Sequence, residues 1–162
     1  MILRQAEEGD FEELLRLNQE WVHFTSPLDV EALARLHRES ASHSVIETHD
    51  GIVAFLLALR EGAEYASPNY RWFEERGGIF LYIDRVIVDH AHQGTGLARL
   101  LYDDLIALAR RSGVRRIVCE LDIDPPNEAS ARFHDRYGFR EVGTQRVAGG
   151  AKLVSLRELD LG

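Results

Sequence analysis

One stretch, residues 86–98, restricts the possible folds of this chain more than any other. It opens with the β-branched apolar run Val86-Ile87-Val88, passes through a polar loop containing Gly94 and Gly96, and leads at once into a helical pattern. The apolar residues of that pattern have amphipathic-helix spacing: Leu97, Leu100, Leu101, Leu105, Ile106 and Leu108. Unpaired amides and the helix dipole at such a junction favour an anion, and glycine lets it approach the backbone. A pyrophosphate suits this geometry best.

Two other glycine-loop signatures fit less well. The dinucleotide fingerprint G-x-G-x-x-G needs a third glycine, and Arg99 stands at that position. Its acidic residue, expected about 20 positions on, could be Glu120 or Asp122, so that criterion alone does not decide. The phosphate loop G-x-x-x-x-G-K-[ST] has no counterpart in the sequence. A simple strand-to-helix turn without a ligand is the alternative interpretation of Gly94 and Gly96.

Three motifs in order resemble the GNAT acetyltransferase superfamily. Gln93-Gly94-Thr95-Gly96-Leu97-Ala98 matches the Q/R-x-x-G-x-G/A signature at every specified position. Residues 127–139 resemble the second motif, N-x-x-A/S-x-x-x-Y-x-x-x-G-F. Near the start, Leu3-Arg4-Gln5-Ala6 followed by Asp10 resembles the usual opening, an R-x-A strand and then a helix. The resemblance spans nearly the whole chain.

This resemblance implies an α/β protein with the GNAT acyl-CoA N-acyltransferase fold, a mixed central β-sheet of about seven strands with helices on both faces. It implies a single domain over residues 1–162, acetyl-CoA as cofactor and CoA as product. The residues expected to hold the cofactor come from the strand end, the glycine loop and a later helix start. They are Val86, Ile87, Val88, Gln93, Gly94, Thr95, Gly96, Leu97, Ala98, Arg99 and Asn127.

Composition narrows the setting. The net charge is −8 and no basic run longer than two arginines offsets it, which argues against a nucleic-acid partner. Cys119 is the only cysteine, so an intrachain disulfide is impossible and a reducing compartment is the default. The longest apolar run, residues 52–59, is too short to cross a membrane, and no signal peptide is expected. We therefore expect a cytoplasmic protein without a membrane partner, and a homodimer stays open.

Periodicity and turn residues predict alternating strands and helices. Strands are predicted at residues 2–4, 45–48, 52–59, 79–88, 116–121, 139–143 and 152–156. Helices are predicted after Asp10 as N-cap, from Pro27, over Leu97–Arg111 and over 127–137, with Gly138 as the stop. The turns 49–51 and 148–150 predict hairpins.

The segment 65–73 combines aromatic rings with amide and hydroxyl groups, as small-molecule pockets do. It lies between two predicted strands, in a connection that superfamily members often use to contact the acceptor. The resemblance therefore implies substrate contacts from Tyr65, Asn69, Tyr70 and Trp72. Packing of a long loop, or half of a dimer contact, is the alternative.

Acetyl transfer needs a base, because the attacking amine loses a proton. Strict alternation in the strand puts Asp84 and Val86 on one face and Ile83 and Ile87 on the other. In the family an acidic residue at this point often takes the proton, so the resemblance implies Asp84 as the base. Glu120, on the neighbouring strand, is the reserve candidate and an expected substrate contact. The alternative for Asp84 is a structural salt bridge with a distant arginine.

The family's second motif usually carries a tyrosine where this chain has His134. A histidine near its ordinary pKa of about 6.5 could protonate the departing thiolate or hydrogen-bond its sulfur. Position 134 lies roughly 20° from the helical face of Asn127, so both should face the cofactor. His134 is thus the predicted acid, with Tyr137 as an alternative.

These features predict an acetyl-CoA-dependent N-acetyltransferase that modifies the primary amine of a small molecule by direct attack in a ternary complex. Two other functions stay open: an acyl-CoA-binding sensor without turnover, and a nucleotide-binding interaction module that uses the loop 94–96. No metal is expected, since His90 and His92 lack a third ligand. The sequence identifies neither the amine nor the length of the acyl group.

Overall fold

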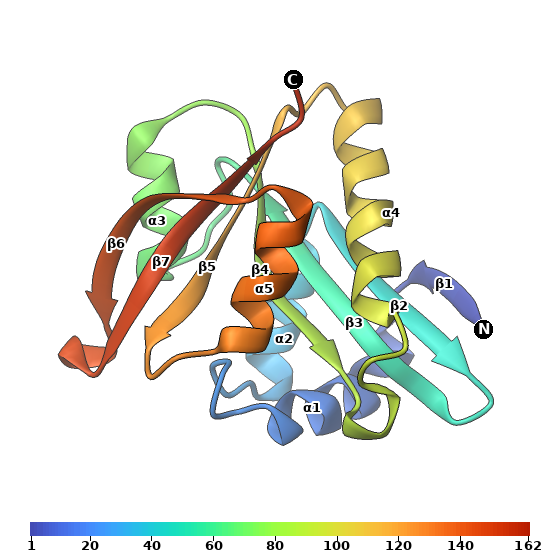
Figure 1. The fold of residues 1–162 in the computed structure, drawn as a ribbon. Coiled ribbons are helices and arrows are strands. Elements are labelled where there is room, and N and C mark those ends of the chain that lie inside the picture. Colours follow the sequence, from blue (N-terminus) through green and yellow to red (C-terminus); the bar gives the residue numbers. More distant parts are fainter.

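The computed structural model describes residues 1–162. Seven strands form one sheet in the order β1-β2-β3-β4-β5-β7-β6, in which only β4 and β5 pair in parallel (Figure 1). The strands are β1 (Ile2–Gln5), β2 (Ser42–Thr48), β3 (Gly51–Arg60), β4 (Leu81–Val88), β5 (Arg116–Asp124), β6 (Arg140–Val147) and β7 (Lys152–Asp160). The helices are α1 (Phe11–Glu20), α2 (Val30–Glu39), α3 (Pro68–Arg76), α4 (Leu97–Arg111) and α5 (Glu128–Tyr137).

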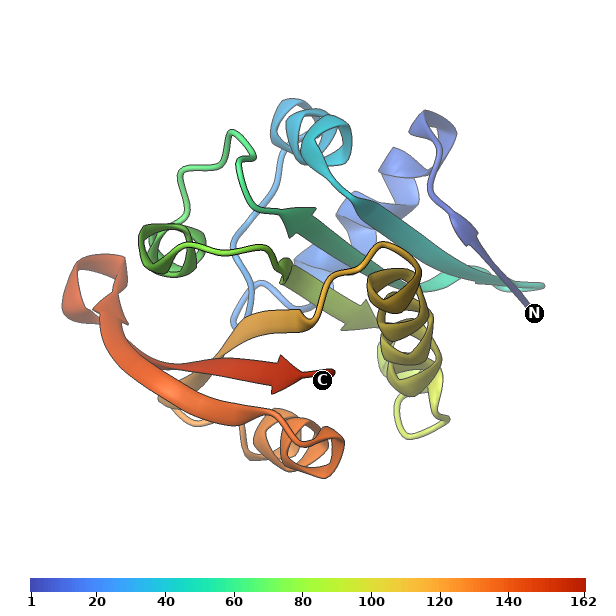
Figure 2. The ribbon, with the colours of Figure 1, turned by 90° about the horizontal axis from the view of Figure 1, so that it is seen from above.

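Helices cover both faces of the sheet. Viewed from above, α1, α2 and α3 lie on one side, and α4 and α5 lie on the other (Figure 2). Under α4 and α5, buried residues such as Leu101, Leu105 and Phe139 form the largest apolar cluster. Two smaller clusters lie under α3 and under the α1–α2 pair. The α/β class and the mixed, two-sided sheet predicted from the sequence are confirmed.

Local signals explain most helix ends, with two corrections. α4 begins and ends as predicted, with Gly96 at its N-cap in the left-handed region at φ +85°. α2 begins at Val30, because the Asp29 carboxylate accepts a hydrogen bond from the Ala32 N–H, so the start predicted at Pro27 is wrong. Asp10 does not cap α1 with its side chain, since its carboxylate accepts hydrogen bonds from Arg4 and from the Glu7 N–H.

The aromatic segment contains a helix that the periodicity did not reveal. α3 occupies residues 68–76, which the sequence pattern treated as an irregular connection. Ser67 accepts a hydrogen bond from the Tyr70 N–H and Pro68 takes the first helical position, both ordinary features of a helix start. Strands β5, β6 and β7 also extend beyond their predicted ends, because pairing with neighbours continues past the apolar pattern.

A bulge in β4 changes which side chains share a face. Leu57 pairs with Arg85 and Ala58 pairs with Ile83, so Asp84 is an extra residue in the ladder. Val86 therefore packs in the cluster under α4, whereas Ile87 packs in the cluster under α1. The predicted alternation, which put Asp84 with Val86 and Ile83 with Ile87, is wrong because it assumed an unbroken strand.

Candidate functional site

A gap between β4 and β5 opens into a large cavity. The two strands pair only at Leu81 with Ile117 and at Tyr82 with Val118, and then diverge (Figure 1). The cavity that opens between them has a volume of about 1470 Å³. Its walls come from the α1–α2 connection, the segment before α3, both diverging strands and the facing ends of α4 and α5. Backbone groups of β4 beyond Tyr82 thus face a cavity in place of a neighbouring strand.

The predicted cofactor residues gather at one end of this cavity. Those that line it are Val86, Ile87, Val88, Gln93, Gly94, Gly96, Leu97, Ala98, Arg99 and Asn127. Thr95 does not, because its hydroxyl turns back to donate to the His92 carbonyl at 2.6 Å. Gly94 and Gly96 have φ angles of +73° and +85°, which glycine adopts without strain. A Cβ added at either glycine would meet nothing within 4 Å, so the backbone there is open to a ligand.

Trp21, which the sequence pattern did not single out, fixes the end of β4. Its indole N–H donates to the Val88 carbonyl at 2.8 Å, and the Gln93 amide donates to the same oxygen at 2.9 Å. The indole also stacks on His90, with ring centroids 4.3 Å apart. Trp21 lies 67 residues before Val88, so only the folded chain reveals this contact.

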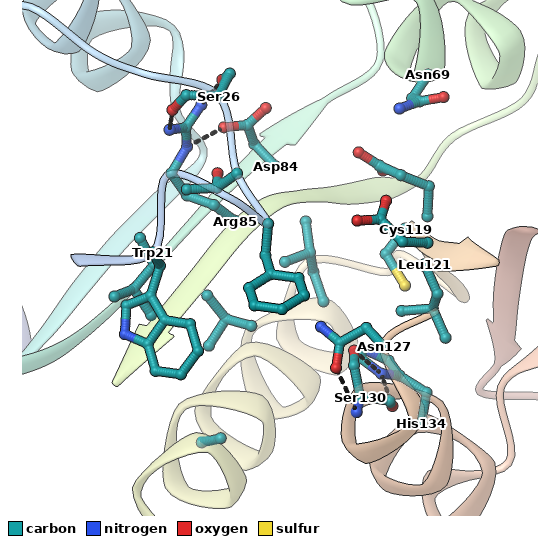
Figure 3. Close-up of a pocket in the computed structure, with 18 of the residues that line it drawn as sticks. Trp21, Ser26, Asn69, Asp84, Arg85, Cys119, Leu121, Asn127, Ser130 and His134 are labelled. Carbon is teal, nitrogen blue, oxygen red and sulfur yellow. Dashed lines mark hydrogen bonds and ion pairs between the residues drawn. The ribbon is translucent and has the colours of Figure 1, made fainter. Parts of the chain in front are cut away.

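His134 faces the cavity from α5, but both of its ring nitrogens are engaged (Figure 3). Nδ1 lies 2.7 Å from the Ser130 carbonyl, which can only accept, so Nδ1 carries the proton. Nε2, 2.7 Å from the Tyr102 hydroxyl, then accepts a hydrogen bond. Burial lowers the pKa of His134, which keeps the ring neutral. This arrangement argues against the predicted role of His134 as acid.

Tyr137 and Asn127 complete the α5 side of the cavity. The Tyr137 hydroxyl donates to Asp103 at 2.8 Å and so ties α5 to α4. The side-chain oxygen of Asn127, Oδ1, accepts a hydrogen bond from the Ser130 N–H and so caps α5. The Asn127 side chain also borders the cavity (Figure 3). Both residues therefore shape this part of the cavity wall through contacts between and within the helices.

Asp84 is held in a buried ion pair. Its carboxylate accepts from Arg85 Nε at 2.6 Å, and the two side chains are 4% and 3% exposed. Tyr65 donates its hydroxyl proton to the other oxygen. Arg85 also donates to Ser26 (Figure 3) and to Asn18. Asp84 therefore forms a structural salt bridge, the alternative to its role as the base. Its partner is the adjacent Arg85 and not a distant arginine.

Glu120 has the surroundings of a base. Both of its carboxylate oxygens lie 2.9 Å from the Tyr82 hydroxyl, and the side chain borders the cavity. Burial, together with the negative charge of Asp84, raises the pKa of Glu120 to about 8. Of the other acidic residues that line the cavity, Glu64 is exposed, and Asp84, Asp103 and Asp122 have cationic partners in Arg85, Arg99 and Lys152. Glu120 has none, so it can accept a proton near neutral pH.

Only part of the aromatic segment reaches the cavity. Tyr65 and Asn69, two of the four expected substrate contacts, line it. Tyr70 is buried away from it, where its hydroxyl donates to the Arg60 carbonyl at 2.6 Å. Trp72 packs over Gly143, where an added Cβ would lie 2.3 Å from the indole. For Tyr70 and Trp72 the packing alternative is correct, because the helix α3 turns both side chains toward the sheet.

Two further properties of the fold bear on its partners. None of the helices has the length and hydrophobicity needed to span a bilayer. No group of three or more His, Cys, Asp and Glu side chains is arranged to hold a metal ion.

The chain matches the Acetyltransferase (GNAT) family over residues 8–139 and belongs to it. The family resemblance carried by the three sequence motifs is thereby confirmed. Among curated proteins, the phosphinothricin N-acetyltransferase of Streptomyces viridochromogenes is 31% identical over 98 residues. That alignment covers 60% of this chain and 51% of the relative, so the chain spans about half the length of that protein.

Solved structures show the same fold at low identity. An N-acetyltransferase from Staphylococcus aureus Mu50 superposes with a TM-score of 0.73 at 21% identity, over 99% of this chain and 98% of that one. The structure of yncA from Salmonella typhimurium, with its cofactor acetyl-CoA, gives a TM-score of 0.71 at 23% identity, over 100% and 94% of the two chains. The arrangement of strands and helices is therefore that of GNAT proteins along the whole chain.

Proposed function

We propose that this protein is an acetyl-CoA-dependent N-acetyltransferase that modifies a primary amine of a small molecule in a ternary complex. The observation that carries the proposal is one cavity with two chemically different ends. A glycine-rich helix start lies at one end, and the Glu120 carboxylate, which has no cationic partner, lies toward the other. The relative named for phosphinothricin N-acetylation and the neighbour that contains acetyl-CoA support the same activity.

The cofactor end fits the pyrophosphate and pantetheine of acetyl-CoA. Open space beside Gly94 and Gly96 lets an anion reach the backbone N–H groups at the start of α4, where the helix dipole favours negative charge. Backbone groups of β4 that face the gap between the strands, such as those of Val86, can hydrogen-bond an amide-containing arm; the Val88 carbonyl is already engaged by Trp21 and Gln93. When bound, acetyl-CoA supplies a thioester whose carbonyl is open to attack by an amine.

Glu120 replaces Asp84 as the proposed base. Its carboxylate removes a proton from the amine at one Oε atom, while the Tyr82 hydroxyl holds its orientation. A base with a pKa of about 8 is partly ionised at neutral pH and strong enough to deprotonate the nitrogen as it attacks. The ionised fraction of Glu120 also attracts a cationic amine into the cavity. Tyr65 and Asn69 are the proposed contacts of the acceptor.

Two measurements test the proposal. Calorimetric titration should show binding of acetyl-CoA and CoA in preference to NAD and ATP; preference for NAD or ATP would favour the nucleotide-binding alternative. A thiol-release screen over amino acids, polyamines and aminoglycosides should then find an acceptor; acetyl-CoA binding without turnover across the screen would favour the sensor.

The base is tested with Glu120→Gln, which should lower kcat/KM by about 10²–10⁴-fold and leave acetyl-CoA affinity intact. Glu75→Gln, which neutralises an exposed carboxylate on α3, is the matched control and should retain full activity. Equal activity of the two variants would exclude Glu120 as the base.

A further inference from the structure

The peptide group that joins Val88 to Asp89, at the end of β4, is held from both sides. The Asp89 N–H donates to the Val53 carbonyl on β3 at 2.8 Å, so residues 53 and 89 form a hydrogen-bonded pair of the antiparallel ladder. Hydrogen-bonded and non-hydrogen-bonded pairs alternate, so in the preceding pair, Ala54 with Val88, the backbone groups of Val88 point away from β3. The Val88 carbonyl therefore faces the side where β4 and β5 diverge, and there it accepts two hydrogen bonds.

Only one of the two donors to this carbonyl comes from outside the glycine loop, residues 89–96. Gln93 belongs to the loop, and its side-chain amide ties the loop back to the strand that precedes it. Trp21 follows the last residue of α1, donates its indole N–H at 2.8 Å, and lines the cavity beside the end of β4 (Figure 3). The Val88 carbonyl is thus the point at which the end of α1 holds the strand that leads into the loop.

Few other contacts tie the loop to the rest of the domain. Its side-chain hydrogen bonds are mostly local, such as the one that the Thr95 hydroxyl donates to the His92 carbonyl at 2.6 Å. His90 stacks on the Trp21 indole, with ring centroids 4.3 Å apart. The contact between His92 and the exposed Asp50, at 3.4 Å, is an ion pair only when the histidine is protonated. The direction in which the loop leaves β4 therefore depends chiefly on Trp21.

We propose that Trp21 is a positioning residue for the cofactor: by holding the Val88 carbonyl and the His90 ring, it orders the glycine loop before acetyl-CoA binds. The inference rests on the proposed function, in which the backbone N–H groups of this loop bind the pyrophosphate. A loop that is ordered in advance loses less conformational entropy on binding. Without the indole N–H, part of the binding energy is used to order the loop, and the affinity for acetyl-CoA falls.

Trp21→Phe tests the inference, because it removes the indole N–H and keeps an aromatic ring beside His90. In calorimetry the variant should bind acetyl-CoA about three- to tenfold more weakly, the equivalent of one lost hydrogen bond. The kcat value at saturating acetyl-CoA should stay within about twofold of wild type, since the loop is then ordered by the ligand. Trp72→Phe makes the same change at the other tryptophan of the chain, which packs over Gly143, and should keep wild-type affinity.

Hydrogen exchange separates positioning of the loop from a general loss of packing. In the free Trp21→Phe protein, the amides of residues 89–96 should exchange faster than in wild type, whereas those of α1 should keep their rates. Saturating acetyl-CoA should return the loop to slow exchange. Equal acceleration in α1 and in the loop would show that the substitution disturbs the helix, and would overturn the inference.

Tryptophan fluorescence tests the same contact without changing it. In Trp72→Phe, Trp21 is the only tryptophan, and its emission should change when acetyl-CoA saturates the protein. In Trp21→Phe, the remaining Trp72 should not respond. An unresponsive Trp21, or wild-type acetyl-CoA affinity in Trp21→Phe, would overturn this inference and leave the proposed function standing. Failure of the wild-type protein to bind acetyl-CoA would instead refute the proposed function, and this inference with it.

Discussion

Asp84 forms its ion pair with Arg85, the next residue in the chain, at a distance of 2.6 Å and almost out of contact with solvent. Such a pair is possible because the bulge at Asp84 lets consecutive side chains turn to the same side of the sheet. The pair also connects the β4 strand to Ser26 in the α1–α2 connection, through the Arg85 guanidinium.

Asp84→Asn should therefore act first on stability. The substitution leaves Arg85 buried without its counter-charge, which should lower the free energy of unfolding by about 3 kcal/mol in urea denaturation. Arg16→Gln, which breaks the exposed pair between Arg16 and Glu20, should cost about 0.5 kcal/mol at most. Unchanged stability with a large loss of kcat would show that Asp84 is the base after all.

A second prediction concerns His134. Because its Nδ1 proton is held by the Ser130 carbonyl and Nε2 accepts from Tyr102, the ring has no free proton to give to a thiolate. In His134→Gln, stability should fall by about 1–3 kcal/mol, since buried partners lose hydrogen bonds. The kcat value should stay close to wild type from about pH 6 to pH 9, where an acid with the ordinary histidine pKa would titrate.

Tyr137→Phe is the companion variant, because it removes the hydroxyl of the other candidate acid and keeps the ring. A large fall of kcat in His134→Gln alone, with unchanged KM, would restore the sequence-based assignment of His134 as acid. The same fall in Tyr137→Phe alone would transfer that role to Tyr137.

The glycine loop offers a comparison between two glycines of similar conformation. Gly96 and Gly113 have φ angles of +85° and +71°, and a Cβ at either position would meet nothing within 4 Å. Alanine should thus strain both sites by about 1–2 kcal/mol. Only Gly96→Ala should weaken acetyl-CoA binding, by about tenfold in Kd, because only Gly96 faces the cavity. Equal acetyl-CoA affinities of the Gly96→Ala and Gly113→Ala variants in titration calorimetry would show that the glycine loop does not bind the cofactor.

Acid stability should depend on His43. Burial lowers the pKa of His43 to about 4, and the nearby charge of His37 acts in the same direction. The unfolded chain therefore binds a proton between the ordinary pKa and about 4 that the folded chain does not, so stability falls as the pH falls through this range.

Denaturation at pH 7 and pH 4.5 measures this effect. In His43→Phe the loss on acidification should be smaller than in wild type by up to about 3 kcal/mol, the value of roughly two pKa units. His49→Phe, at an exposed turn, is the matched control. An identical acid loss in His43→Phe and wild type would contradict the prediction.

The sequence predicted the order of strands and helices well where the signal is local. The helix Leu97–Arg111, the stop at Gly138 and the hairpin turn at 49–51 all follow from glycine positions and apolar spacing within one element. α3 was missed because its apolar residues pack on the sheet without a clear helical period, and Ser67 and Pro68 were the signals available.

The site was less predictable, because its chemistry depends on contacts between distant segments. The open backbone at Gly94 and Gly96 matches the expectation from the motifs. The choice between Asp84 and Glu120 depends instead on a bulge and on which carboxylate receives a cationic partner. Alternation along one strand cannot reveal either feature. The contact between Trp21 and Val88 is equally invisible to a local pattern.

The divergence of β4 from β5 leaves the sheet as two panels, β1–β4 and β5–β7, joined by a seam of two residue pairs. A ligand that fills this opening and forms hydrogen bonds with both β4 and β5 takes the place of the missing strand pairing and links the two parts of the sheet. Its binding energy then adds to folding, by about 2.7 kcal/mol at a concentration one hundred times Kd. If the proposed cofactor acetyl-CoA binds there, the resistance of this protein to unfolding and proteolysis should rise and fall with the acetyl-CoA concentration.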